Sequence, residues 1–174
     1  MKHLIESLDQ AVHDENWYSA LFFLVTIPDI CSKLEFPKQR STKLRYSDWI
    51  ENYLYKVDPD YEKHICGVDF YALRCSLLHE GNSDIEGQTA ARRIEHIRFL
   101  KNTSHLATIK DSYSKSDLDG KHILVLSVKQ LSSDIIQAYH LWIAYFSKNP
   151  EFENRMCKSV KIEDFVSICG VVLR

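Results

Sequence analysis

Hydrophobic residues recur at three- and four-residue intervals through much of the chain, a spacing typical of amphipathic helices. Leu4, Ile5, Leu8 and Val12 predict a first helix that ends near His13. The remaining positions of this segment are mostly polar or charged. One face of the predicted helix therefore belongs to the core and the other to solvent.

The next apolar stretch predicts a longer and mostly buried helix that begins at Trp17 and continues through Leu24, Ile27 and Cys31. Pro28 lies inside this stretch. Proline lacks a backbone N–H and its ring clashes with the preceding turn, so we expect a kink or a break there.

Two more helices are expected before residue 82. The third should start at Ser47 or Asp48, where Asp48 and Glu51 have the spacing of a capping box. The fourth should run from Asp69 as N-cap to Gly81, because glycine readily takes the left-handed conformation that ends many helices.

Between residues 94 and 127 the pattern changes to one typical of strands. Apolar and polar residues alternate around Ile97 and again around Ala107, and a nearly continuous apolar run extends from His122 to Val128. Asp119-Gly120 is a turn signal. We predict a small antiparallel sheet or long hairpin at about 94–127, with a helix as the alternative for its first segment.

A last long helix is predicted after the strands. Ser127 and Gln130 have capping-box spacing, and apolar positions continue to Phe146. Asn149-Pro150 should end this helix, and the segment 160–173 fits either a strand or a short helix. The sequence as a whole predicts one mainly α domain over residues 1–174 with a β insertion.

The composition of the chain favours a soluble protein and argues against some classes of function. With 174 residues, 45% hydrophobic and 26% charged, the chain is typical of one soluble domain. Its net charge of -2 argues against broad, nonspecific coating of nucleic acid. Five cysteines without a C-x-x-C pair, and no leader resembling a signal peptide, favour a reducing cytoplasm. The apolar run from Ala20 to Ile27 is too short to span a bilayer, so we expect no membrane insertion.

The segment Arg74-Cys75-Ser76-Leu77-Leu78-His79 carries the strongest chemical signal. Arginine offers a planar fork of donors to phosphate, and histidine exchanges a proton near neutral pH. In a regular α-helix two residues five positions apart differ by about 140° and about 7.5 Å, so Arg74 and His79 should not share a face. His79 should instead share a stripe with the small residues Ala72, Cys75 and Ser76, which predicts a close helix contact or a groove.

This Arg-x4-His element, within the phrase Asp69 to Gly81, resembles the motif of the HEPN superfamily. The resemblance implies a helical-bundle domain that often acts as a metal-independent endoribonuclease and needs no cofactor. It assigns Arg74 and His79 as the catalytic residues, RNA as the substrate, and a homodimer whose paired motifs line one cleft. It also implies a place in a defence or toxin-antitoxin system, with an antitoxin or another protein as partner.

Active HEPN proteins usually have Asn, Asp or His after the motif arginine, whereas this chain has Cys75. Cysteine is a weak hydrogen-bonding group. The departure favours an alternative, a non-catalytic HEPN-like module that binds RNA, a nucleotide or a partner protein. A plain structural domain, in which Arg74 pairs with a carboxylate and His79 interacts with the helix dipole, is a third interpretation.

Other patterns point less clearly to chemistry. The sequence contains neither the paired His/Cys spacings of zinc sites nor a glycine-rich phosphate loop. Cys75 or Ser76 lies within helical reach of His79 as a nucleophile, but an ordinary packing role explains both residues. Two basic clusters fit either RNA phosphate contacts or solvated surface, the first in an expected loop. They are Lys38, Arg40, Lys43 and Arg45, and Arg92, Arg93, Arg98 and Lys101.

Overall fold

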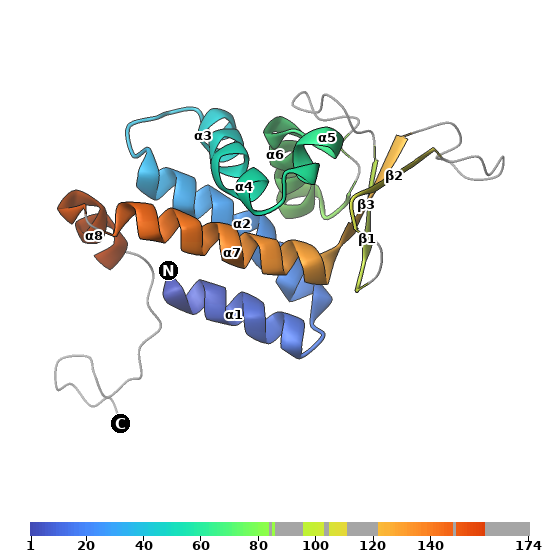
Figure 1. Ribbon diagram of the computed structural model, residues 1–174, viewed down its shortest axis with the longest axis horizontal. Coiled ribbons are helices and arrows are strands. Elements are labelled where there is room, and N and C mark those ends of the chain that lie inside the picture. The colour runs from blue at the N-terminus through green and yellow to red at the C-terminus, as the bar shows by residue number, and fades with distance from the viewer. Residues whose placement is uncertain (84, 86–95, 103–104, 111–121, 148, 159–174) are drawn as a thin grey trace.

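A computed structural model describes residues 1–83, 85, 96–102, 105–110, 122–147 and 149–158 (Figure 1). The chain is mainly helical in this part, with one small sheet, as the hydrophobic pattern predicts. The helical elements are α1 (Lys2–His13), α2 (Trp17–Glu35), α3 (Thr42–Trp49), the π-helix η1 (Ile50–Leu54), α4 (Tyr55–Val57), α5 (Asp60–His64), α6 (Gly67–Cys75), the π-helix η2 (Ser76–Glu80), α7 (Val128–Phe146) and α8 (Pro150–Cys157). The strands are β1 (His96–Leu100), β2 (Ala107–Lys110) and β3 (His122–Ser127).

The two longest helices, α2 and α7, form the centre of the bundle. Helix α7 packs against α1, α2 and η1, while α2 also contacts α3, α6 and α8. Figure 1 shows α3 and α6 on one side of this pair, the sheet beyond the start of α7, and α8 beyond its other end. Trp49 and Trp142 are fully buried in the resulting core.

Helix α2 contradicts the expected break at Pro28, because it continues through this residue as one α-helix. Pro28 is buried and cannot donate to the carbonyl four residues earlier. The hydroxyl of buried Tyr46, on α3, donates to the carbonyl of Val25 at 3.2 Å. Burial of this stretch of α2 and its packing against α3 and α6 therefore hold the helix together around the proline.

Helix α3 starts earlier than predicted, at Thr42 rather than at Ser47 or Asp48. The hydroxyl of Ser41 caps it by accepting a hydrogen bond from the Leu44 amide. The C-terminal half of the basic run Lys38–Arg45 is thus helical rather than part of a loop. The earlier start places Arg45 on a helical face that is buried against α2.

The sheet has the order β1-β3-β2 and is mixed. Strand β2 pairs with β3 in antiparallel fashion as predicted, but β1 pairs with β3 in parallel, so a purely antiparallel sheet is wrong. The first segment is a strand rather than a helix. The nearly continuous apolar run of β3 fits its central position in the sheet. A central strand pairs on both edges, and a strand buried on both faces has apolar residues at successive positions. The predicted turn at Asp119-Gly120 lies outside the described residues.

The end of the described chain contains one helix that the sequence interpretation missed. Ser127 caps α7 as predicted, accepting from the Gln130 amide at 3.3 Å. Asn149-Pro150, expected only to end that helix, also begins α8. The Asn149 side chain accepts from the Phe152 amide, and Pro150 occupies the first helical position, where proline is favourable. The predicted element at 160–173 lies outside the described residues.

Candidate functional site

The segment that carries Arg74 and His79 consists of α6 and η2, and it begins where α6 packs closely against α3. The N-cap is Cys66 and not Asp69, the residue that the sequence predicts. Asp69 lies three positions into the helix, where its carboxylate accepts from the Cys66 amide at 3.3 Å. Gly67 permits the close packing, because a Cβ atom there would lie 2.7 Å from the carbonyl oxygen of Ser47. The helix that carries Arg74 is therefore anchored in the core at its start.

The end of this segment is a π-turn rather than regular α-helix. The amide of Gly81 donates to the carbonyl of Ser76, five residues earlier, which is the hydrogen bond of a π-helix. Gly81 ends the turn with φ of +69°, in the left-handed region, as predicted from the sequence. In a π-turn, residues five apart lie on nearly the same side of the helix, one above the other.

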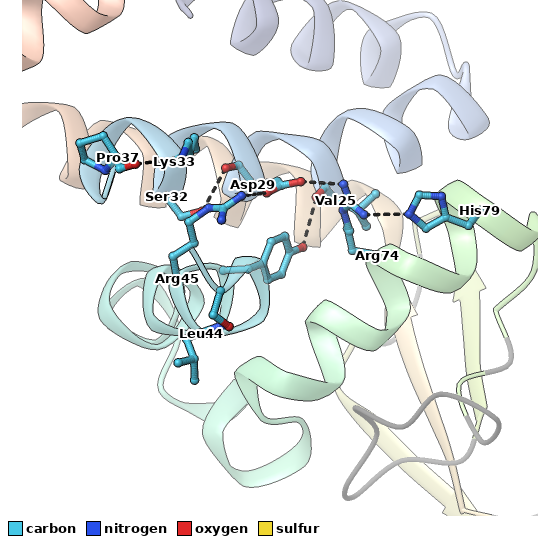
Figure 2. A network of polar contacts seen from close by, with 11 residues as sticks. Val25, Asp29, Ser32, Lys33, Pro37, Leu44, Arg45, Arg74 and His79 are labelled. Atoms are coloured by element: carbon cyan, nitrogen blue, oxygen red, sulfur yellow. Dashed lines mark hydrogen bonds and ion pairs between the residues drawn. The ribbon is translucent and has the colours of Figure 1, made fainter. Parts of the chain in front are cut away.

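This turn corrects the expectation that Arg74 and His79 lie on different faces. The Nη1 of Arg74 lies 3.1 Å from the Nε2 of His79, as Figure 2 shows. Arginine can only donate, so Nε2 must accept, and the imidazole in this contact is neutral with its proton on Nδ1. The His79 side chain is exposed, whereas Arg74 is mostly buried.

Asp29, on α2, holds the other side of the Arg74 guanidinium. Its Oδ2 accepts from Arg74 Nη2 at 2.7 Å, and its Oδ1 lies 3.4 Å from Nη2 of Arg45 (Figure 2). The exposed fractions of the three side chains are only 10–18%. Two cations thus share one carboxylate, and the cluster retains one excess positive charge.

The charge state of Arg74 follows from these neighbours. Burial lowers its pKa, but the Asp29 carboxylate and the adjacent Cys75 side chain raise it by more, so the net shift is upward. Arg74 therefore stays positively charged at any accessible pH. With Nη2 on Asp29 and Nη1 beside an exposed histidine, the guanidinium is fixed in position at the surface of the bundle.

The predicted stripe of small residues does not form an exposed contact surface. Ala72 and Ser76 are completely buried within the chain, and Cys75 is half-buried. The hydroxyl of Ser76 contacts the side-chain oxygen of Asn82 and lies 3.5 Å from a carboxylate oxygen of Glu80. These positions pack the segment against its own bundle, so Ala72 and Ser76 offer no exposed surface to a second copy of the chain.

The basic clusters are only partly associated with the site. Arg45 joins it through Asp29, whereas Lys38 and Arg40 are exposed in the connection before α3. Arg98 and Lys101 are exposed on or beside β1, and Arg92 and Arg93 lie outside the described residues. Among the cluster members that the structure describes, Arg45 is thus the one in contact with the site.

A second histidine cluster connects the sheet to the bundle. The Ser127 amide donates to Nδ1 of His105, so Nε2 carries the proton and donates to the Tyr61 hydroxyl at 2.7 Å. Tyr61 in turn donates to Asp134 at 2.9 Å. Burial lowers the pKa of His105 and raises that of Asp134. Tyr61 is completely buried and Asp134 nearly so, which indicates a structural role.

Asp29 is the site residue that the sequence analysis missed, although a signal for it exists. It is the first charged residue of α2, after twelve uncharged residues of a largely buried helix. A carboxylate in such surroundings needs a cationic partner, because an isolated buried charge is costly. The contact of Arg45 with Asp29 was also missed, because the sequence placed Arg45 in a loop rather than on a buried helix.

Two further properties concern the described residues only. They contain no group of three or more His, Cys, Asp or Glu side chains arranged to hold a metal ion. None of their helices combines the length and apolar composition that a transmembrane helix requires.

Comparisons with protein-family models, with curated proteins and with solved structures find no match to this chain.

Proposed function

We propose that the chain is a HEPN-like, metal-independent endoribonuclease with Arg74 and His79 as its catalytic residues. The observation that carries the proposal is the 3.1 Å contact between Arg74 Nη1 and His79 Nε2 on the π-turn, with His79 exposed. A cation fixed beside a titratable imidazole combines the two functions that RNA cleavage requires. These are phosphate binding and proton transfer.

In the proposed reaction, a phosphate oxygen of RNA replaces His79 as the acceptor for Arg74 Nη1. The released Nε2 of His79 takes the proton of the adjacent ribose 2′-hydroxyl, whose oxygen attacks the phosphorus. The bond from phosphorus to the 5′-oxygen breaks, the 5′-oxygen takes a proton from solvent water, and the His79 imidazolium returns its proton to solvent. Arg74 stabilises the negative charge that develops on the phosphoryl oxygens. The products are a 2′,3′-cyclic phosphate and a 5′-hydroxyl end.

Asp29 acts as a positioning residue in this scheme. Its 2.7 Å contact orients the Arg74 guanidinium so that Nη1 faces His79. Each chain supplies one such pair, so we extend the proposal to a homodimer with both motifs facing one cleft. Light scattering on the purified chain tests that extension.

A non-catalytic RNA- or partner-binding module is the second candidate. It is favoured by Cys75 in place of a polar residue and by Arg74 Nη2 being engaged by Asp29, which leaves fewer donors for a transition state. A protein partner of the kind found in toxin-antitoxin systems would then cover the same residues.

Cleavage of single-stranded RNA in EDTA separates the two candidates. His79→Ala should lower the rate by about 10² to 10⁴, the usual contribution of general acid-base catalysis, and leave RNA binding nearly unchanged. Arg74→Lys keeps the charge but loses the planar fork, so it should weaken both binding and cleavage. Cys75→Asn should raise the rate if a polar residue there assists catalysis.

Two matched variants control this experiment. His140 is an exposed histidine on α7, and Arg40 is an exposed arginine before α3. His140→Ala and Arg40→Lys should both leave cleavage unchanged. Cleavage that survives His79→Ala contradicts the enzyme proposal. Absence of cleavage by the wild-type chain, combined with RNA binding that Arg74→Lys weakens, favours the binding module.

A further inference from the structure

A groove lies beside the C-terminal half of α2, and it shares Asp29 and Arg45 with the cluster around Arg74. It has a volume of about 820 Å³ and is formed by the start of α1, α2, α3 and the end of α8. Small-molecule sites in proteins usually have volumes of about 300 to 1,000 Å³. Its apolar wall includes Leu4, Ile30 and Leu34. Neither Arg74 nor His79 lines it, so the groove requires an explanation of its own.

The charged side chains of the groove have mostly one sign. Among the described residues of the lining, Lys33, Arg45, Arg155 and Lys158 contribute four cations and Asp29 contributes one carboxylate. The whole chain has a net charge of -2, so this positive charge is a local concentration. Charge of one sign over an apolar wall favours a ligand that carries the opposite charge on an apolar body.

Arg45 is the most informative of these cations because it is about nine-tenths buried. Within the described part of the chain, its one hydrogen bond to a carboxylate is the long 3.4 Å contact with Asp29, whose other oxygen lies closer to Arg74. Its Nε is buried without a hydrogen-bond partner. A buried guanidinium with unused donors is costly unless an acceptor completes its hydrogen bonds.

Lys33 and Arg155, which lie nearer the surface, have hydrogen-bond donors that their contacts within the described chain do not use. Lys33 Nζ donates to the Pro37 carbonyl at 2.9 Å, and Arg155 Nε donates to the Leu34 carbonyl at 2.8 Å. The Nη1 of Arg155 also lies 3.7 Å from a carboxylate oxygen of Glu151, an exposed residue on the same helix, which leaves Nη2 without an ion pair among the described residues. An ammonium group has three donors and a guanidinium has five. Both side chains are thus held at the groove while retaining donors for a bound anion.

We propose that this groove binds a small organic anion that has one carboxylate or phosphate group and an apolar body. The anionic group accepts hydrogen bonds from Arg45, whose planar fork matches both kinds of oxygen pair. The apolar body covers Leu4, Ile30 and Leu34. The ligand is a free molecule, since the anionic group must reach a side chain that is nine-tenths buried.

Titration calorimetry with decanoate and with decyl phosphate, below their micelle concentrations and without RNA, tests the proposal. We expect both to bind, and decyltrimethylammonium, with the same chain length and the opposite charge, not to bind. Arg45→Gln should weaken binding by about tenfold to a hundredfold, the loss expected for charge-assisted hydrogen bonds. Lys38→Gln, an exposed cation outside the groove lining, should change nothing.

A second variant keeps the test decisive if Arg45→Gln does not fold. Ile30→Trp fills the groove without changing its charge and should abolish binding. The proposal is overturned if neither anion binds the wild-type chain, or if the cation binds equally well. Undiminished binding by folded Arg45→Gln, or by Ile30→Trp, also overturns it. Sedimentation with phosphatidylglycerol vesicles, but no affinity for decanoate or decyl phosphate, would assign the charge to a membrane surface instead. None of these outcomes depends on RNA cleavage.

Discussion

Replacing Asp29 by asparagine tests the arrangement that supports the site. The substitution keeps the size of the side chain and one accepting oxygen, but it removes the charge that Arg74 and Arg45 share. Hydrogen bonds to charged groups contribute about 1.5 to 3 kcal/mol to the free energy of unfolding. The 3.4 Å contact between Asp29 and Arg45 is long for a hydrogen bond and should contribute little. Partial exposure of the cluster reduces the effect further, so we expect a loss of about 2 kcal/mol in the free energy of unfolding.

Urea denaturation measures this loss. With a slope of about 1 to 3 kcal/mol/M for a small protein, the midpoint should fall by about 1 M while the slope stays unchanged. Asp9→Asn, which neutralises an exposed carboxylate on α1, is the matched control and should change the free energy by less than about 0.5 kcal/mol. Asp29→Asn and Arg74→Gln should also be non-additive when combined. A midpoint equal to that of wild type, or strict additivity, would refute the reasoning.

Two other predictions concern backbone conformation and pH. Gly81→Ala places a side chain at φ of +69°, where a residue with a Cβ atom is strained, even though nothing lies within 4 Å of the added Cβ. The substitution should lower the free energy of unfolding by about 1 kcal/mol and lower the melting temperature. An unchanged melting temperature would contradict this prediction. The lowered pKa of His105 means that its contribution to stability is complete above its unfolded value of 6.5 and is lost as pH falls through the folded pKa. The difference in free energy of unfolding between wild type and His105→Gln should therefore shrink as the pH falls below 6.5. Urea denaturation at several pH values measures this difference, and a difference that stays constant with pH would contradict the prediction.

The sequence predicted the helices with the strongest periodicity and the clearest caps. Helices α1 and α7 and the left-handed Gly81 have the predicted places, because local signals at Ser127 and Gly81 agree with the tertiary structure. Helix α2 continues through Pro28, because buried packing outweighs the lost hydrogen bond. The parallel pairing of β1 with β3 joins segments distant in sequence, and apolar periodicity does not specify the order of strands.

The sequence named Arg74 and His79 as candidate site residues, but it did not predict the contact between them. Regular α-helical spacing separates Arg74 from His79, whereas the π-turn at Ser76–Glu80 brings them into contact. No periodicity in the sequence distinguishes five residues of π-helix from α-helix. Asp29 comes from a helix 45 residues earlier, and its pairing with Arg74 required the packed bundle.

The central claim is that Arg74 and His79 form a metal-independent site that uses the ribose 2′-hydroxyl of RNA. The most direct measurement compares a single-stranded RNA that the wild-type chain cleaves in EDTA with the same strand carrying one 2′-deoxynucleotide immediately 5′ of the cleaved bond. We predict cleavage of the all-ribose strand to a 2′,3′-cyclic phosphate, and loss of cleavage at that bond in the substituted strand. Equal cleavage of both strands, or products without a cyclic phosphate, would contradict the account.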